Sequence, residues 1–338
     1  MSRNLLVIQL RQIGDVVLTT PIPRILKEEL PGCRVAFLTE APSHELLREN
    51  PWIDRVLVHA RRGGAAHQLA LARRLRRERY DAVLDFMANP RSALLAYLSG
   101  APVRVSYPVR GRGLLYTHRV APELGYPVAY KKSLLGALGI RSGRDRPEIH
   151  LTDDELRWGR ELRARLLGGR PGRLVTVDPT HRRPSRRWPE DHWGRLAAGV
   201  ADRAGARPVI LWGPGEEAAA EEVLAHAGGR AVRAPRLTLR RLASLIAAAD
   251  LHLGNCSAPR HIAVAVGTPS FTVLGSSSGD WTHPAPEHAH LALGLGCQPC
   301  KHRECPRGTA CLVELEPSRV LDRLLEWAGN TLGWRDAG

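Results

Sequence analysis

A carboxylate, Asp15, follows the first apolar run of the chain. Residues 5–10 (LLVIQL) are mostly apolar and suit a buried strand. Gly14 permits a tight turn before a second apolar run, so Asp15 is expected just beyond the carboxyl end of the first strand. Ligands bind there in open α/β sheets. An aspartate at this place either caps a helix or acts as a catalytic base, and taken alone it favours neither role.

Two loops in the second half of the chain carry groups that bind phosphates. Residues 178–189 (DPTHRRPSRRWP) follow an apolar run and offer the Thr180 hydroxyl and four arginines. Arginine provides planar N–H donors that match phosphate oxygens. Residues 254–261 (GNCSAPRH) place Ser257 at an expected helix start, where backbone N–H groups attract anions. These loops predict a nucleotide site, but a flexible basic loop and a simple helix cap would explain the same residues.

A third loop, residues 212–216 (WGPGE), ends in a carboxylate at the start of an expected helix. Glu216 either accepts hydrogen bonds from ribose hydroxyls or complements the positive end of the helix dipole. His261, after the second loop, either approaches a ligand or is a packed residue of the first helical turn.

Four cysteines cluster near the end of the chain with the spacing C-x2-C-x4-C-x5-C. Such a cluster can hold a structural zinc ion or an iron–sulfur cluster, and it can equally consist of four reduced thiols. Disulfides are disfavoured because the chain is expected to be cytosolic. Both alternatives stay open for Cys297, Cys300, Cys305 and Cys311.

Strand-like and helix-like segments alternate along both halves of the chain. Expected strands cover residues 34–39, 55–59, 82–86, 103–106, 174–178, 208–212, 251–254 and 270–274. Expected helices include residues 68–78, 91–98, 152–167, 189–204, 216–227, 239–248, 259–266 and 317–327. This alternation predicts right-handed βαβ units in two successive doubly wound domains, with residues 168–172 (GGRPG) as the hinge.

Composition excludes several classes of protein. The 338 residues suit two domains, and no apolar run approaches the length of a membrane span. Charged residues within the first apolar region argue against a signal peptide. No dinucleotide fingerprint follows the first strand, and no phosphate-binding P-loop is present. The net charge of +15 favours an anionic partner, but no nucleic-acid-binding module is recognisable.

Four segments, in this order, resemble the bacterial lipopolysaccharide heptosyltransferases of glycosyltransferase family 9. They are QLRQIGDVVLTTP, AFLTEAPSHELLRENPWIDRVLV, DPTHRRPSRRWP and GNCSAPRHIAVAVGTP. The resemblance implies an α/β fold of the GT-B type, with two Rossmann-like doubly wound parallel-sheet domains facing across a cleft. Residues 1–152 would bind the acceptor and residues 153–316 the nucleotide sugar, and the helix at 317–330 would pack back on the first domain.

The resemblance also implies the reaction and the roles of single residues. A heptose would pass from ADP-L-glycero-D-manno-heptose to the inner core of lipopolysaccharide, with inversion and without a metal or other catalytic cofactor. Asp15 matches the family's base, which favours that role over the helix cap. Arg186 matches the residue that meets the diphosphate. The other residues implied on the donor side are Thr180, Arg182, Glu216, Asn255, Cys256, Ser257 and His261.

Cys256 departs from the family, which usually has an aspartate at this position. A thiol cannot accept the charge-assisted hydrogen bonds that a carboxylate accepts. Two alternatives therefore remain: a transferase of the same family that uses another nucleotide sugar, and a non-catalytic relative that binds anionic glycan or lipid.

The expected acceptor is the lipid A–core glycan at the cytosolic face of the inner membrane. A cytoplasmic protein peripherally associated with that membrane would meet anionic lipid and glycan phosphates, which attract basic residues. We therefore expect acceptor or membrane contacts from basic residues in loops of the first domain, namely Arg61, Arg62, Arg110, Arg112, Lys131 and Lys132.

Overall fold

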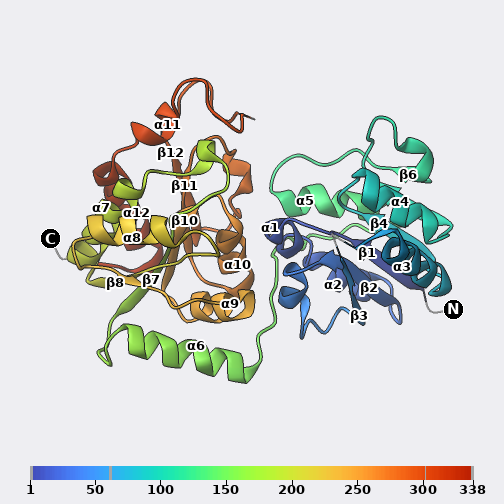
Figure 1. The fold of residues 1–338 in the computed structure, drawn as a ribbon, viewed down its shortest axis with the longest axis horizontal. Helices are drawn as coiled ribbons and strands as arrows, with labels where there is room; N and C mark the ends of the chain where they lie inside the picture. The colour runs from blue at the N-terminus through green and yellow to red at the C-terminus, as the bar shows by residue number, and fades with distance from the viewer. Residues whose placement is uncertain (1–2, 61–62, 301, 336–338) are drawn as a thin grey trace. The chain divides into compact units, whose positions relative to one another are not determined.

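The computed structural model describes residues 3–60, 63–300 and 302–335 and divides the chain into two compact units (Figure 1). Unit 1 comprises residues 1–150 and unit 2 residues 151–338. The division lies two residues before the expected boundary. It also precedes the helix at 153–166, so the glycine-rich segment at 168–172 lies inside unit 2 and is not the hinge.

Unit 1 is built on a parallel six-stranded sheet with the order β3-β2-β1-β4-β5-β6. Alternate residues of the first strand enter different cores, since successive side chains of a strand point to opposite faces. Leu5 and Val7 join one buried cluster, and Leu6 and Ile8 join the other. The strands are β1 (Asn4–Ile8), β2 (Arg34–Glu40), β3 (Arg55–His59), β4 (Ala82–Asp85), β5 (Val103–Ser106) and β6 (His118–Arg119).

Helices cover both faces of this sheet, which explains why its strands are apolar on both sides. They are α1 (Ile13–Val17), α2 (Pro21–Glu29), α3 (Ala65–Arg77), α4 (Pro90–Leu98) and α5 (Pro127–Lys132), with the short 3₁₀ segments η1 (Ser43–Leu47), η2 (Gly113–Leu115) and η3 (Ser133–Leu138).

Unit 2 repeats the same topology. Its parallel sheet has the order β12-β11-β10-β7-β8-β9, so its first and fourth strands are again neighbours at the centre. The strands are β7 (Arg173–Asp178), β8 (Ala206–Ile210), β9 (Val232–Arg233), β10 (Leu251–Asn255), β11 (Ser270–Leu274) and β12 (His288–Ala292). The prediction of two doubly wound parallel sheets is therefore confirmed.

The helices of unit 2 are α6 (Asp153–Leu166), α7 (Glu190–Ala204), α8 (Glu217–His226), α9 (Leu239–Ala247), α10 (Ala258–Val266), α11 (Ala310–Val313) and α12 (Pro317–Leu332), with the 3₁₀ segments η4 (Pro184–Arg186) and η5 (Gly279–Trp281). Helix α6 packs on α9, and Glu155 of α6 forms an ion pair with the buried Arg240 of α9. The bound guanidinium lowers the pKa of Glu155 to about 2.

The C-terminal helix α12 packs within unit 2, so the expectation that residues 317–330 pack back on the first domain is wrong. Val320 and Leu324 lie one helical turn apart and are fully buried in the core cluster of unit 2. Helix α12 lies against α7, where a Cβ at Gly199 would overlap Leu321. The absence of a side chain at Gly199 therefore allows α12 to pack closely against α7.

No helix among the described residues is both long and apolar enough to cross a membrane.

Candidate active site

Each sheet has one point where the strand order reverses, and ligands of doubly wound folds bind beyond the carboxyl ends of the strands there. In unit 1 this point lies between β1 and β4, and in unit 2 it lies between β7 and β10. Asp15 follows β1, while Thr180 and Ser257 follow β7 and β10. Topology therefore places the sequence-predicted residues of each unit at that unit's expected binding edge.

Asp15 is half-buried in the first turn of α1 and is not the residue that caps this helix. Gln12 occupies the cap, and its backbone N–H donates to Asp15 Oδ2 over a long 3.4 Å. Gly14 lies inside the same helix, so it does not form the turn that we expected. Among the described residues the carboxylate accepts no stronger hydrogen bond, so it remains able to accept a proton from a ligand.

Two buried polar side chains brace the segment that carries Asp15. The Thr19 hydroxyl donates to the Asp15 carbonyl oxygen at 2.7 Å. The Gln9 amide donates from Nε2 to the carbonyl oxygen of Arg11 at 2.6 Å. Gln9 and Thr19 are 2 % and 0 % exposed, so both side chains are buried. They fix the β1–α1 connection and with it the place of the carboxylate.

The basic residues expected on the acceptor side differ widely in position. Arg110 is exposed, whereas Arg112 is half-buried and its Nε donates to the Ala88 carbonyl oxygen. Lys132 is half-buried and donates to the Ser142 carbonyl oxygen at 3.0 Å. Lys131 is 4 % exposed, so the expectation that it contributes to a membrane-facing surface is wrong. Arg61 and Arg62 lie outside the described residues.

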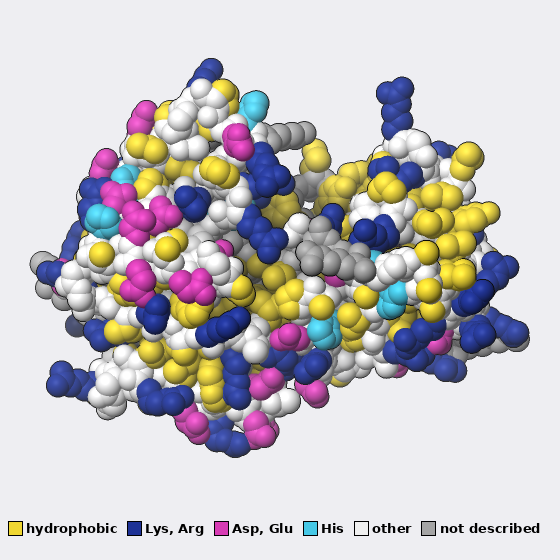
Figure 2. Space-filling view, viewed as in Figure 1, with side chains coloured by type: hydrophobic (Ala, Val, Ile, Leu, Met, Phe, Trp, Pro, Cys, Tyr) yellow, Lys and Arg dark blue, Asp and Glu magenta, His cyan; other side chains and the backbone are white. Residues whose placement is uncertain are grey.

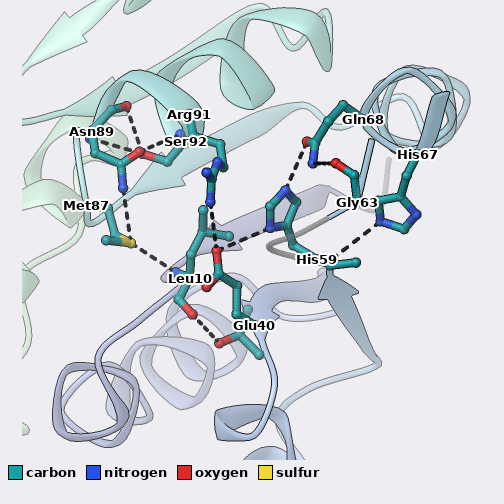
Figure 3. A network of polar contacts seen from close by, with 12 residues as sticks. Leu10, Glu40, His59, Gly63, His67, Gln68, Met87, Asn89, Arg91 and Ser92 are labelled. Carbon is teal, nitrogen blue, oxygen red and sulfur yellow. Dashed lines mark hydrogen bonds and ion pairs between the residues drawn. The ribbon is translucent and has the colours of Figure 1, made fainter. Parts of the chain in front are cut away.

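A second polar cluster lies at the carboxyl ends of β2 and β3 (Figure 3). The buried Glu40 accepts from His59 Nδ1 and from Arg91 Nη1, each at 3.3 Å. His59 Nε2 lies 2.9 Å from Gln68 Oε1, and Gln68 in turn donates to the Gly63 carbonyl oxygen. Sequence reasoning missed this cluster. It joins β2, β3, α3 and α4 at the edge where the acceptor is expected.

Asp85 is a second carboxylate at the switch point of unit 1, and sequence reasoning missed it too. It is fully buried and accepts from the Tyr116 hydroxyl at 2.7 Å and from the Met87 backbone N–H at 2.9 Å. Burial raises its pKa above the ordinary aspartate range. Its oxygens are therefore occupied by the protein, in contrast to those of Asp15.

In unit 2, a buried carboxylate joins the two loops that are expected to bind phosphate. Asp178 ends β7 and accepts a short hydrogen bond from the Ser257 hydroxyl, and Thr180 also donates to it. Ser257 therefore occupies the cap position of α10, but its hydroxyl donates to Asp178 and does not cap the helix. Burial, with a smaller effect of Glu216, raises the pKa of Asp178 to about 7. A Cβ at Gly254 would lie 3.1 Å from that of Asp178, so glycine allows this approach.

Arg186 is turned inward, whereas Arg182 is exposed. Burial lowers the pKa of Arg186, and its Nε is buried without a hydrogen-bond partner among the described residues. A buried N–H donor without a partner is costly, and a phosphate oxygen would satisfy it. Beside it, burial and the charge of Arg186 lower the pKa of His181 to about 4, so this imidazole is neutral at pH 7.

Asn255 and Cys256 are both buried and belong to the second loop, at residues 254–261. The Asn255 amide donates to the Pro179 carbonyl oxygen at 2.8 Å and accepts from the Trp188 backbone N–H at 3.1 Å. These bonds hold the loop at residues 178–189, so Asn255 has a structural role. Cys256 lies close enough to Arg186 to influence the pKa of its guanidinium group. The residue that departs from the family therefore sits beside the cation expected to meet the diphosphate.

Glu216 and His261 already have contacts within the protein. Glu216 lies directly before α8, and its Oε2 accepts from the Gly213 backbone N–H at 2.8 Å, which closes the WGPGE turn. The buried His261 ring lies 6.0 Å from that of Trp281. Both residues stand at the binding edge of unit 2, and a ligand would have to share these contacts.

The buried Arg260 is a feature of unit 2 that sequence reasoning missed. It is 1 % exposed, and its Nη2 donates to the Trp281 carbonyl oxygen at 2.6 Å. Its charge lowers the pKa of the neighbouring His252 and His290, after the larger effect of burial. The sequence does show an arginine within the GNCSAPRH loop. Its burial, however, follows only from the packing of α10.

The described residues contain no group of three or more histidine, cysteine or acidic side chains arranged to hold a metal ion. All four clustered cysteines are free thiols. Burial, and then the other three thiols, raise the pKa of Cys311 to about 11, so the four lie near one another. In this arrangement they do not form a ligand set, and no step proposed below involves a metal.

The model of glycosyltransferase family 9 (heptosyltransferase) matches residues 68–310, which is most of the chain. The chain belongs to glycosyltransferase family 9. The protein is thus a glycosyltransferase, and the matched region includes both loops that are expected to bind phosphate.

Curated relatives and solved structures agree with this family. Lipopolysaccharide heptosyltransferase 3 of Escherichia coli is 28 % identical over 294 residues, covering 82 % of this chain and 84 % of that protein. Lipopolysaccharide heptosyltransferase 2 of the same species is 24 % identical over 95 % of this chain and 97 % of its own length.

Among solved structures, a family 9 glycosyl transferase from Veillonella parvula has a TM-score of 0.83 at 19 % identity, covering 98 % of this chain and 99 % of its own. The ADP-heptose lipopolysaccharide heptosyltransferase II of E. coli has a TM-score of 0.75 at 22 % identity, covering 97 % and 98 %. These similarities confirm the α/β fold with two doubly wound sheets.

Proposed function

We propose that this family 9 enzyme transfers a heptose from ADP-L-glycero-D-manno-heptose to the inner core of lipopolysaccharide, with inversion and without a metal. The observation that carries the proposal is the inward-turned Arg186 at the switch point of unit 2, in a loop where a phosphate would satisfy its unpartnered Nε. Two curated relatives are lipopolysaccharide heptosyltransferases. A solved E. coli heptosyltransferase of similar fold was determined with ADP-2-deoxy-2-fluoro heptose.

In this proposal unit 1 supplies the base. The acceptor hydroxyl oxygen attacks the anomeric carbon of the heptose, and its proton passes to the Asp15 carboxylate. The bond between that carbon and the ADP oxygen breaks as the new bond forms on the opposite face, so the configuration inverts. The half-buried position of Asp15 and its weak hydrogen bond from the Gln12 backbone N–H suit a group that must accept a proton.

Unit 2 stabilises the leaving group. ADP departs with the electron pair of the broken bond, so negative charge grows on its diphosphate. The Arg186 guanidinium and the N-terminal end of α10 would offset that charge. Thr180 and Ser257 would have to exchange their bonds to Asp178 for phosphate oxygens. The carboxyl group of Glu216 is the candidate for the ribose hydroxyls.

Cys256 makes the identity of the donor sugar the part of the proposal to test first. It is buried beside Arg186, where the family usually has an aspartate. A transferase of another nucleotide sugar is therefore the second candidate function. Cys256→Asp should raise kcat/KM for ADP-heptose if the wild-type enzyme uses that donor poorly.

The test is turnover of the purified full chain with ADP-heptose and other nucleotide sugars, using heptose-deficient core oligosaccharide as acceptor. Mass spectrometry should show an acceptor that has gained one heptose. Arg186→Ala should lose this activity, and Arg187→Ala is the matched control because Arg187 is exposed and pairs with Glu190. Turnover with another nucleotide sugar alone would replace the proposed donor. Glycan binding without any turnover would favour the non-catalytic alternative.

We also propose that unit 1 docks on an anionic membrane that carries the acceptor. Exposed apolar side chains gather on α3, α4 and η2, and α4 packs against both other elements. This outer apolar face consists of Leu69, Leu94 and Tyr97, each 50 % exposed, and Leu114, 97 % exposed. Figure 2 shows hydrophobic side chains over the α4 side of unit 1 with basic side chains beside them. Arg104 lies over the Tyr97 ring at 5.6 Å.

Apolar groups beside basic ones suit the interface of an anionic bilayer. Apolar side chains enter the boundary between headgroups and acyl chains, and arginines meet the lipid phosphates. Among the expected basic residues, the exposed Arg110 has the position that this role requires. In this proposal the protein is cytoplasmic and peripherally associated with the inner membrane.

A further inference from the structure

Lys131 is a buried lysine, and its nearest contacts do not balance the charge of its ammonium group. It lies on α5 and is 4 % exposed. Its Nζ donates to Gln9 Oε1 at 2.8 Å and lies 5.7 Å from the centroid of the Phe86 ring. Lysines are almost never fully buried unless they are paired, because an ammonium loses its hydration. A neutral amide and a ring face do not balance a full charge.

The carboxylate whose charge acts on Lys131 is that of Asp15. Hydrogen bonds connect the two residues as well. Gln9, which accepts from Lys131, holds the Arg11 carbonyl oxygen in the segment before Asp15. Thr19 lies between Gln9 Oε1, at 3.4 Å, and the Asp15 carbonyl oxygen, at 2.7 Å. A residue that is 116 positions later in the chain thus supports the segment that presents Asp15.

We propose that Lys131 is a positioning residue for Asp15, which holds the β1–α1 segment through Gln9 and supplies the positive charge that the Asp15 carboxylate faces. The proposal rests on the proposed function, in which Asp15 accepts the proton of the acceptor hydroxyl. Lys131 acts through Asp15 and takes no proton from the acceptor itself.

The two tyrosines around Asp15 keep their neutral phenol forms near neutral pH. The rings of Tyr107 and Tyr130 lie 4.4 Å apart, and burial raises the pKa of both phenols, with Asp15 adding to the effect. Asp85 acts on Tyr107, and burial raises the pKa of Asp85. Burial lowers the pKa of Lys131. Among these groups Lys131 is the cation, and its lowered pKa brings the loss of its charge closer to neutral pH.

The test compares Lys131→Met and Lys131→Arg with the wild-type enzyme over a pH range. Lys131→Met should lower kcat by about tenfold or more and leave the KM of the nucleotide sugar unchanged, because the donor residues belong to unit 2. Wild-type kcat should fall on the alkaline side as Lys131 loses its proton. In Lys131→Arg most of the activity should remain and this fall should move to higher pH, because a guanidinium stays charged.

Lys27→Met is the matched control. Lys27 is another lysine of unit 1, and it forms an ion pair with Asp54 at 2.7 Å, outside the contacts of Asp15. Its kcat and pH profile should equal those of the wild type. An unchanged kcat in Lys131→Met, or the same alkaline fall in the lysine and arginine enzymes, would overturn the inference.

A double-mutant cycle in urea unfolding tests the pair without any substrate. Asp15→Asn leaves a buried ammonium without its counter-charge, so the combined variant Asp15→Asn/Lys131→Met should lose less stability than the sum of the single variants. Additive losses would contradict the pairing. Absence of wild-type turnover with ADP-heptose would refute the proposed donor instead, and the cycle would still decide the role of Lys131.

Discussion

The two units share one strand topology but place opposite electrostatics at their switch points. In unit 1 the charge of a half-buried carboxylate, Asp15, acts on a buried lysine, Lys131. In unit 2 the carboxylate, Asp178, is itself buried and engaged by hydroxyls, while the arginine Arg186 is left unpartnered at Nε. One edge suits the acceptance of a proton and the other suits an anion. The shared topology determines where a site forms, and the side chains determine its chemistry.

The surfaces differ as well. The exposed large apolar side chains of the described residues are Val58, Leu69, Leu94, Tyr97, Leu114, Leu124 and Tyr130 in unit 1, and Val313 alone in unit 2. Such an asymmetry is expected if one unit meets a lipid-anchored acceptor and the other a soluble nucleotide sugar.

Among the variants that test the different roles of the two units, Asp15→Asn should have the largest effect. Loss of the base should lower kcat by about 10²–10⁴-fold, because proton transfer in the transition state contributes about that much. ADP affinity should be unchanged, since Asp15 belongs to unit 1. Steady-state kinetics and calorimetric ADP titration measure the two effects. Glu29→Gln, an exposed carboxylate of unit 1, is the control, and near-normal turnover of Asp15→Asn would remove the base from unit 1.

Arg186→Ala tests the anion site of unit 2. It should cost roughly 2–4 kcal/mol of transition-state stabilisation, as lost charge-stabilising donors do in other enzymes. ADP binding should weaken too, in contrast to Asp15→Asn. Kinetics and ADP titration of this variant should be compared with those of Arg187→Ala. An equal loss in both variants would mean that the basic loop acts as a diffuse charge.

The buried Asp178 should make the stability of unit 2 depend on pH. Its pKa of about 7 in the folded protein exceeds the ordinary value of 3.8, so the folded state binds the proton more tightly than the unfolded chain. The free energy of unfolding should therefore fall as the pH rises from about 4 to about 7, by at most about 1.4 kcal/mol per pH unit, and stay lowered above that range.

Asp178→Asn should lose less stability than the wild type between pH 4 and pH 8. Urea unfolding at both pH values measures this difference. Asp202→Asn is the control, because Asp202 pairs with Arg230 on the surface of the same unit. Identical pH dependence in Asp178→Asn and the wild type would show that Asp178 stays ionised when buried.

The smallest expected effect concerns the outer apolar face of unit 1. Tyr97→Ser and Leu114→Ser should each weaken sedimentation with anionic vesicles, and Arg110→Ala should cost about 1 kcal/mol of binding at low salt. Val313→Ser in unit 2 should have no effect. Equal binding to neutral and anionic vesicles, or no binding to anionic vesicles at low salt, would leave the charge of unit 1 without a membrane role.

Much of the fold could be read from the sequence, because local patterns carry it. The alternation of apolar strands and amphipathic helices predicted two doubly wound sheets, and the observed strand orders confirm them. Loops after β1, β7 and β10 were predicted as binding loops because polar residues follow apolar strands there. The strand orders place the loops of each unit at one edge of its sheet, because the carboxyl ends of parallel strands share that edge, and their binding role stays a prediction.

The sequence by itself determined which chemical groups stand at these strand ends: Asp15, the arginines after β7 and Ser257 before α10. It could not decide burial or partners that depend on distant segments. Only the tertiary structure buried Lys131 against Gln9, packed α12 against α7, and joined Asp178 to Ser257. A lysine in a loop and a lysine in a core read alike in one dimension, because burial is a property of what packs around a residue.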